Sequence, residues 1–216
     1  MTVTLQTKFD YIDLYPVTCS ELSLGRSNLE VVRDLIKGGV KIIQYREKKL
    51  SKKELFKESL LLRELTSAHN VLLIINDHID IAIAVNADGV HLGQEDLPCR
   101  EARKILGYDK IIGISTHNEK EALCAQYDGA TYINIGPIFA TNTKENQILP
   151  LGLKKIQDIK KNINIPFTVM GGINESNIKE VLVAGASKIA VVSALVSKED
   201  IVSAVRKMIA QIKIWK

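Results

Sequence analysis

Short apolar runs rich in β-branched residues recur along the chain, and longer segments of helical period separate them. The runs cover residues 11–18, 40–44, 71–75, 89–92, 111–115, 132–135, 167–170 and 189–192. Polar or glycine-containing turns bound each run, as is typical of buried strands. The pattern therefore predicts eight strands that alternate with helices.

The segments between the runs carry the signals of helix ends. Ser27 and Ser51 stand three positions before Glu30 and Glu54, and an apolar periodic stretch follows each pair. This arrangement has the form of a capping box, in which the serine and the glutamate each satisfy a free backbone N–H of the first helical turn. We expect one helix to begin at each of these two serines.

Strands that are apolar almost throughout are typical of a parallel sheet with helices on both faces. Closing eight such units gives an α/β fold of the (β/α)₈ type, a TIM barrel. Because no Pro/Ser-rich linker divides the chain, we expect a single domain over residues 1–216, with the barrel core at about 11–212. An open doubly wound sheet is disfavoured because no G-x-G-x-x-G motif follows the first run.

Composition narrows the classes of partner. The chain has 216 residues, 46% of them hydrophobic and 25% charged, which is an ordinary globular balance. A net charge of +4 is modest, and the lysines are spread over many expected helix faces with few aromatic residues among them. We therefore expect no nucleic-acid groove, whereas small anionic substrates are compatible with this charge.

The cysteines and the apolar segments bear on the compartment. Cys19, Cys99 and Cys124 are far apart, and no C-x-x-C pair occurs, which favours a reduced cytoplasmic protein. No apolar run approaches the roughly 20 residues that span a bilayer, and acidic residues stand early in the N-terminal segment, so we expect neither a membrane span nor a signal peptide. The sequence is compatible with a homo-oligomer.

The second expected strand runs into a charged stretch, Gln44-Tyr45-Arg46-Glu47-Lys48. Strand alternation places Gln44, Arg46 and Lys48 on one side. Arginine and lysine at the carboxyl end of a barrel strand suit a phosphate or carboxylate group. Taken alone, this stretch fits an anion clamp and a solvated strand end about equally well.

The third and fourth expected strands each end in carboxylates. Asn76 and Asp77 follow the third strand, and Asp96 closes the segment after the fourth. Neighbouring strands lie roughly 5 Å apart, so the two aspartates could share a hard cation such as Mg²⁺. Each aspartate taken singly is more typical of a helix cap.

Ser115 and His117 follow the fifth strand. His117 could shuttle protons, although a histidine at a helix start is more often a cap or a packing residue. No acid–base pair in the sequence marks Ser115 as a nucleophile. We expect a hydrogen-bonding role for Ser115.

Polar and glycine-rich segments follow the last three strands. Residues 140–147 are polar with no helix pattern, which fits either a surface loop or a lid over the site. Gly171-Gly172 and Val192-Ser193 follow the seventh and eighth strands, where barrels commonly bind phosphate through backbone N–H groups. Two tight turns are the alternative.

Taken in order, these motifs resemble the thiamine phosphate synthase family. The matching stretches are QYREK at 44–48, IND at 75–77, HLGQED at 91–96, GISTH at 113–117, GPIFATNTK at 136–144, GGI at 171–173 and VSA at 192–194. Each motif is weak alone, but the set has family-like spacing from about residue 14 to residue 195. The resemblance therefore covers most of the chain.

The resemblance implies a barrel that joins hydroxymethylpyrimidine diphosphate to a thiazole phosphate and releases pyrophosphate. It assigns the pyrimidine diphosphate to Gln44, Tyr45, Arg46, Glu47, Lys48, Asn76, Ser115 and Lys144, of which Arg46, Lys48, Ser115 and Lys144 would act in catalysis. It assigns the thiazole phosphate to Thr141, Asn142, Thr143, Gly172, Val192 and Ser193. Asp77 and Asp96 would bind Mg²⁺ as the cofactor.

Two positions depart from the family pattern. His78 stands where a second aspartate is common, and Cys19 follows the first strand where an acidic residue is common. Two rival functions also remain: a thiazole tautomerase that uses a histidine such as His117, and a phosphate-binding barrel without catalysis. The pyrimidine and metal residues argue against the tautomerase, and the paired carboxylates argue against the binding protein.

Overall fold

The computed structural model describes residues 9–141 and 149–215, and within them eight parallel strands form one sheet. The strands are β1 (Leu14–Pro16), β2 (Ile42–Tyr45), β3 (Leu72–Asn76), β4 (Gly89–Leu92), β5 (Ile111–Thr116), β6 (Tyr132–Ile135), β7 (Phe167–Val169) and β8 (Ile189–Val191). Their order in the sheet is β1-β8-β7-β6-β5-β4-β3-β2. Every strand predicted from the sequence is present.

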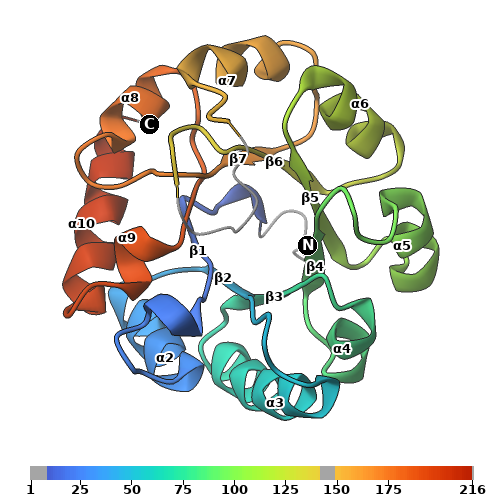
Figure 1. The fold of residues 1–216 in the computed structure, drawn as a ribbon, viewed down its shortest axis with the longest axis vertical. Coiled ribbons are helices and arrows are strands. Elements are labelled where there is room, and N and C mark those ends of the chain that lie inside the picture. The colour runs from blue at the N-terminus through green and yellow to red at the C-terminus, as the bar shows by residue number, and fades with distance from the viewer. Residues whose placement is uncertain (1–8, 142–148, 216) are drawn as a thin grey trace, which may run out of the picture.

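Helices surround the ring of strands, as Figure 1 shows. They are a short 3₁₀ helix η1 (Ser20–Leu22), α2 (Asn28–Gly38), α3 (Lys52–Ala68), α4 (Ile79–Ala84), α5 (Cys99–Leu106), α6 (Glu119–Tyr127), α7 (Leu153–Lys160), α8 (Ile178–Val183), α9 (Ser193–Val196) and α10 (Ile201–Ile214). Alternation of parallel strands and outer helices is the TIM-barrel architecture, so the predicted fold class is confirmed.

The barrel closes between β1 and β2. Val17 forms a parallel bridge with Gln44, and the backbone N–H of Thr18 donates to the carbonyl of Gln44 over 2.9 Å. The backbone N–H of Val17 donates to the carbonyl of Val191 on the other side, also over 2.9 Å. The segment after β1 therefore joins the two ends of the sheet.

The first strand is shorter than the sequence predicted. It covers Leu14–Pro16 rather than residues 11–18. Phe9 and Ile12, just before it, are fully buried in the cluster that fills the barrel interior, where the Phe9 ring stacks on Tyr132 at 4.3 Å between centroids. This segment is apolar because it packs against the interior of the barrel. Apolar composition alone does not distinguish such a segment from a strand.

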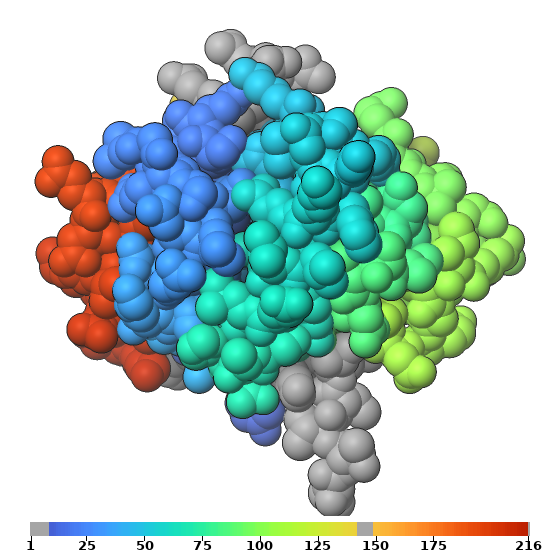
Figure 2. Space-filling view, turned by 90° about the horizontal axis from the view of Figure 1, so that it is seen from below, coloured from blue at the N-terminus to red at the C-terminus, as the bar shows by residue number. Residues whose placement is uncertain are grey.

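Strand alternation produces two separate cores. Ile42 and Ile74 belong to the interior cluster, whereas their neighbours Ile43 and Ile75 belong to the larger cluster between the strands and the outer helices. Figure 2 shows the outside of this second layer, with α2, α3 and α4 side by side across one face. Burial on both faces accounts for strands that are apolar almost throughout.

Both predicted capping boxes are confirmed. The Ser27 hydroxyl accepts from the N–H of Glu30 at the start of α2, and the Glu30 carboxylate accepts from the N–H of Ser27. Ser51 and Glu54 make the same pair at the start of α3. These caps fix where the first two long helices begin, and so set the length of the loops after β1 and β2.

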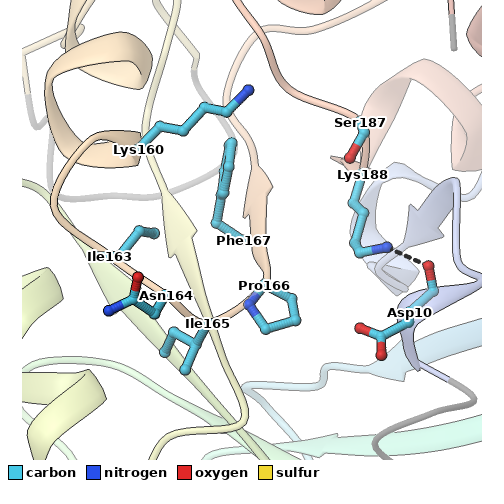
Figure 3. A pocket seen from close by; sticks show the side chains of 9 residues that line it. All are labelled: Asp10, Lys160, Ile163, Asn164, Ile165, Pro166, Phe167, Ser187 and Lys188. Atoms are coloured by element: carbon cyan, nitrogen blue, oxygen red, sulfur yellow. Dashed lines mark hydrogen bonds between the residues drawn. The ribbon is translucent and has the colours of Figure 1, made fainter.

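A shallow hollow lies at the amino-terminal end of β7 and β8, as Figure 3 shows. The Lys188 ammonium there donates to the backbone carbonyls of Asp10, over 2.6 Å, and Ile12, over 3.3 Å. This contact ties the segment before β1 to the strand that pairs with it. Barrels usually reserve this end for stability, and the site described below lies at the opposite end.

Among the helices that the structure describes, none is both long enough and apolar enough to cross a bilayer.

Candidate active site

The carboxyl ends of β2, β3, β4 and β5 place polar side chains at one rim of the barrel. Gln44 and Ser115 are buried there, and Asn76 and Asp77 are half-buried. Asn76 pairs in register with His91 of β4, and Ser115 pairs with Asn134 of β6. Residues far apart in the sequence are thus brought together because parallel strands all end at this rim.

Gln44 faces the interior of the barrel. Its side-chain amide donates to the Tyr15 hydroxyl over 3.2 Å, and only 2% of the residue is exposed. Two residues on, the N–H of Arg46 donates to the Thr18 hydroxyl over 2.9 Å, and that hydroxyl donates back to the Arg46 carbonyl over 3.3 Å. The end of β2 is therefore held by β1 and the segment that follows β1.

Tyr45 and Glu47 lie on the opposite face of β2. Tyr45 belongs to the outer core, and its hydroxyl donates to Glu58 of α3. The Glu47 carboxylate accepts from the Ser20 N–H at 3.1 Å and from the Asn28 side chain at 3.0 Å. Both side chains thus help to hold the end of the strand, and their predicted contact with the pyrimidine diphosphate stays a prediction.

Asp77 and Asp96 face each other across β3 and β4, with a hydrogen bond between their carboxyl groups. The Lys48 ammonium lies 2.5 Å from Oδ2 of Asp77, and Oδ2 of Asp96 accepts from the Gly93 N–H over 2.7 Å. Asp77 takes a left-handed backbone conformation, with φ of 61°, and its N–H donates to the His91 carbonyl over 2.9 Å. The fold thus sets two carboxylates and one ammonium in a single cluster.

The electrostatics of the pair are asymmetric. Burial opposes ionisation of Asp77, but hydrogen bonds from Lys48 and Asp96 and the charge of Lys48 hold its pKa below the ordinary value. Burial raises the pKa of Asp96, and the neighbouring Asp77 adds to that rise against the opposing bond from the Gly93 N–H. Of the two carboxyl groups, Asp96 is therefore the one that is more easily protonated.

Neither aspartate caps a helix. His78 stands at the N-cap of α4 and Pro98 at the N-cap of α5, and neither helix has a side-chain cap. Two carboxylates that would otherwise repel each other fit a hard divalent cation, and Mg²⁺ commonly takes one or two protein carboxylates plus substrate oxygens. Among the described residues, no group of three or more His, Cys, Asp or Glu forms a metal cluster.

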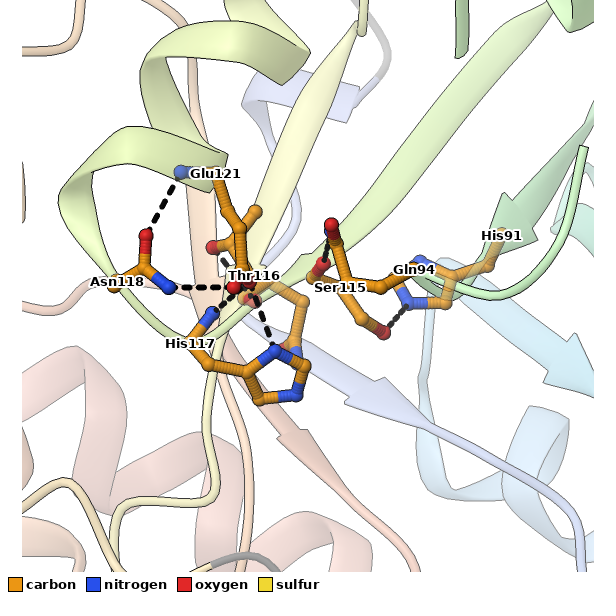
Figure 4. A network of polar contacts seen from close by, with 8 residues as sticks. His91, Gln94, Ser115, Thr116, His117, Asn118 and Glu121 are labelled. Carbon is orange, nitrogen blue, oxygen red and sulfur yellow. Dashed lines mark hydrogen bonds and ion pairs between the residues drawn. The ribbon is translucent and has the colours of Figure 1, made fainter. Parts of the chain in front are cut away.

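His117 is held by the helix that follows it, as Figure 4 shows. Its N–H and its Nδ1 both lie within hydrogen-bonding distance of Oε2 of Glu121, at 2.8 Å and 2.9 Å. Asn118 caps α6 by accepting from the N–H of Glu121. The structure therefore favours the packing role of His117 over that of a proton shuttle.

Ser115 is fixed by two neighbours, Gln94 and His91, to which the sequence motifs give no role. The Gln94 side chain donates to the Ser115 carbonyl over 2.6 Å, and Nε2 of His91 lies 2.9 Å from the Ser115 hydroxyl. Both residues belong to the HLGQED stretch. Strand alternation was the available signal, since His91 lies two positions after Gly89 on β4 and so shares its inward face.

The turns after β6 and β7 press against each other. The N–H of Phe139 donates to the Gly171 carbonyl over 3.0 Å. A Cβ on Gly172, whose φ is 63°, would come within 2.5 Å of the Ala140 carbonyl. Glycine is therefore required at Gly172, and the contact brings the start of the 140–147 segment, including Thr141, beside the glycine turn.

The remaining predicted site residues lie nearby or outside the described part. Val192 stands at the N-cap of the short helix α9, and Ser193 is exposed at its first position. Asn142, Thr143 and Lys144, with most of the expected lid, fall outside the described residues.

The two departures from the family pattern have local explanations. Nδ1 of His78 lies 2.9 Å from the Lys52 ammonium, which also binds Asp80. Burial first, and then the charge of Lys52, lower the pKa of His78. Cys19 is buried just before η1 and is a free thiol. Neither side chain belongs to the cluster of Lys48 and the two aspartates.

A closed parallel barrel with a carboxylate pair and cationic side chains at the carboxyl ends of its strands defines the class: a TIM-barrel enzyme for an anionic substrate. The family model described as "Thiamine monophosphate synthase" matches residues 14–195. The chain therefore belongs to the thiamine monophosphate synthase family, and it is a transferase.

Individual relatives agree with this assignment. The thiamine-phosphate synthase of Pelotomaculum thermopropionicum is 48% identical over 91% of this chain and 90% of its own length. The thiamine-phosphate synthase of Caldicellulosiruptor bescii is 49% identical over 89% of this chain and 88% of its own length. The solved thiamine phosphate pyrophosphorylase from Pyrococcus furiosus superposes with a TM-score of 0.87 at 34% identity, covering 98% of this chain and 99% of that one.

Proposed function

We propose that the protein condenses 4-amino-2-methyl-5-hydroxymethylpyrimidine diphosphate with 4-methyl-5-(2-phosphooxyethyl)thiazole, or with its 2-carboxy form, giving thiamine phosphate and pyrophosphate. The observation that carries this proposal is the cluster of Lys48, Asp77 and Asp96 at the ends of three consecutive strands, with Lys48 2.5 Å from Asp77. A diphosphate leaving group needs charge neutralisation of the kind that such a cluster, loaded with metal, supplies.

Asp77 and Asp96 would hold Mg²⁺ in this proposal, and the ion would neutralise the oxygens of the departing diphosphate. The two carboxyl groups lie near enough to shift each other's pKa, which supports their acting on one ion. A bound cation would displace any proton held by Asp96, and Lys48 would then turn from Asp77 toward the diphosphate.

Arg46, Lys48 and Lys144 would stabilise the negative charge that develops on pyrophosphate as the carbon–oxygen bond breaks. The electron pair leaves with pyrophosphate, and the pyrimidine ring delocalises the positive charge left at its methylene carbon. The thiazole nitrogen then donates its lone pair to that carbon. No protein nucleophile takes part, so catalysis rests on positioning and electrostatics.

Gln44, Asn76 and Ser115 would orient the pyrimidine, because they line the rim beside the carboxylate pair. The thiazole phosphate would lie across the rim, against Thr141, Asn142, Thr143, Gly172, Val192 and Ser193. Backbone N–H groups at a glycine turn and at a helix start suit a phosphate group.

The test is to incubate the purified protein with both substrates and Mg²⁺ and to measure thiamine phosphate and pyrophosphate together. We expect the two products in equal amounts, and none when Mg²⁺ is chelated. Conversion between thiazole tautomers without condensation would instead support the tautomerase, for which the contact between His117 and Glu121 leaves little freedom. No turnover with either substrate set would refute both.

We also propose a cytoplasmic location and no nucleic-acid partner. The three cysteines are free thiols, two of them buried, which suits a reducing compartment. Small phosphorylated molecules are the expected partners. Cell fractionation, with a disulfide-bonded periplasmic or secreted protein as the control, tests the location.

A further inference from the structure

A chain of hydrogen bonds crosses the floor of the site inside the barrel. From Gln44 it passes to the Tyr15 hydroxyl over 3.2 Å and on to the Tyr132 hydroxyl over 2.9 Å. From Tyr132 it continues to Nδ1 of His91 over 2.9 Å, and Nε2 of His91 lies 2.9 Å from the Ser115 hydroxyl. The chain thus links two rim residues through three buried side chains.

The Gln44 donor favours one direction along this chain, in which every buried O–H group has an acceptor. The Gln44 amide donates to the Tyr15 oxygen, so the Tyr15 O–H is left to donate to Tyr132. Tyr132 in turn donates to Nδ1 of His91, which must then be unprotonated. A neutral histidine with an unprotonated Nδ1 carries its proton on Nε2. The Nε2–H group of His91 then donates a hydrogen bond to the Ser115 oxygen.

Burial keeps this direction in place. Tyr15 is 1% exposed, Tyr132 is fully buried and His91 is 6% exposed. Burial raises the pKa of both tyrosines, so both phenols stay protonated and able to donate. The rings are also packed, since Tyr132 stacks on Phe9 at 4.3 Å and lies 5.7 Å from the His91 ring.

We propose that His91, backed by Tyr132 and Tyr15, is a positioning residue that fixes the Ser115 hydroxyl as a hydrogen-bond donor toward the pyrimidine substrate. With its oxygen accepting from His91, Ser115 has its own O–H free for an acceptor atom on the ligand. The inference rests on the proposed function, because it takes Ser115 to face the pyrimidine.

The roles of the two ring nitrogens of His91 can be tested separately by substitution. In His91→Gln the side-chain amide nitrogen is as many bonds from Cα as Nε2, so the donor to Ser115 is kept. In His91→Asn the amide group reaches only as far as Nδ1, so the contact with Tyr132 is kept and that with Ser115 is lost. We expect kcat of His91→Gln within about threefold of wild type and kcat of His91→Asn about 10-fold to 100-fold lower.

The KM for the thiazole substrate should change little in either variant, because Ser115 lies on the pyrimidine side of the proposed site. Thr168→Val is the matched control, since Thr168 makes a buried 2.8 Å hydrogen bond to Asn134 inside the same barrel. Its kcat should stay near that of wild type. Equal losses of kcat in His91→Gln and His91→Asn would overturn the proposal.

Nitrogen-15 NMR of the histidine side chains tests the same idea without turnover. The chain has four histidines, and loss of one set of signals in His91→Gln assigns His91. We expect an Nε2–H tautomer in wild type and in Thr168→Val, and a mixture of tautomers in Tyr132→Phe. An Nδ1–H tautomer in wild type would overturn the proposal, whereas absent synthase turnover with the expected tautomer would count against the proposed function instead.

Discussion

The Lys48 ammonium lies 2.5 Å from the Asp77 carboxylate, which in turn raises the pKa of the neighbouring Asp96. This arrangement joins a cationic side chain after β2 to the acidic pair after β3 and β4. A metal ion held by that pair would free Lys48 for the leaving diphosphate. The two aspartates would then hold the ion, and Lys48 would help to neutralise the charge that develops during the reaction.

Lys48→Met should lower kcat by about 100-fold, because one donor to the departing charge is removed. The apparent pKa of Asp77 should rise, since its hydrogen bond and ion pair with Lys48 are lost. Steady-state kinetics at saturating Mg²⁺ measures the first effect. Lys49→Met is the control, because Lys49 pairs with Glu21 on the surface. The kcat of this variant should stay near that of wild type.

Binding of Mg²⁺ with pyrophosphate should release a proton from Asp96, whose pKa is raised by burial and by Asp77. A group with a raised pKa holds its proton as the pH falls through that value, so Mg²⁺ affinity should weaken toward acid. Calorimetry in two buffers of different ionisation enthalpy measures the release. Equal apparent binding enthalpies in the two buffers would mean that no proton is released, and would contradict the prediction.

Gly172→Ala should raise the KM for the thiazole substrate by roughly tenfold, because the new Cβ would meet the Ala140 carbonyl at 2.5 Å and shift the turn. Gly25→Ala is a matched control. Gly25 also has a positive φ, of 79°, but a Cβ there meets nothing within 4 Å. A similar KM in both variants would show that backbone strain, rather than the contact with Ala140, governs the effect.

Lys188→Met should lower the free energy of unfolding by about 1–3 kcal/mol, because the carbonyls of Asp10 and Ile12 lose a buried charged donor. The kinetic constants should not change, since Lys188 lies at the opposite end of the barrel. Urea unfolding followed by circular dichroism measures the difference against Lys161→Met, an exposed lysine. Equal stability of the two variants would refute the role of Lys188.

The fold could be predicted from the sequence because it depends on local signals. Strand runs and the capping boxes at Ser27 and Ser51 act within a few residues, and the structure confirms them. The first strand was overestimated because Phe9 and Ile12 are apolar for another reason, which is that they pack inside the barrel. Apolar composition cannot distinguish these two forms of burial.

The site could be predicted only in part. Motif resemblance treats the stretch from Gln44 to Lys48 as one unit, whereas strand alternation separates Tyr45 and Glu47 from the inward face. The choice between helix cap and shared site for Asp77 and Asp96 depends on a contact between neighbouring strands, which spacing alone does not determine.

Strand alternation indicates that His91 faces the interior, but it does not identify the partners of the side chain. Its partner Tyr132 is 41 residues away in the sequence, and the hydrogen bond exists only because β4 and β6 face the same interior. Long-range contacts of this kind follow from barrel closure, and no short motif encodes them.

The most direct test of the central claim is the rate of pyrophosphate release by wild type and by Asp96→Asn as Mg²⁺ is titrated, with both substrates present. We predict saturable Mg²⁺ dependence in wild type and, in Asp96→Asn, a rate at least about 100-fold lower with the fold intact by circular dichroism. Wild-type release that does not depend on Mg²⁺, or an Asp96→Asn rate equal to that of wild type, would contradict the account.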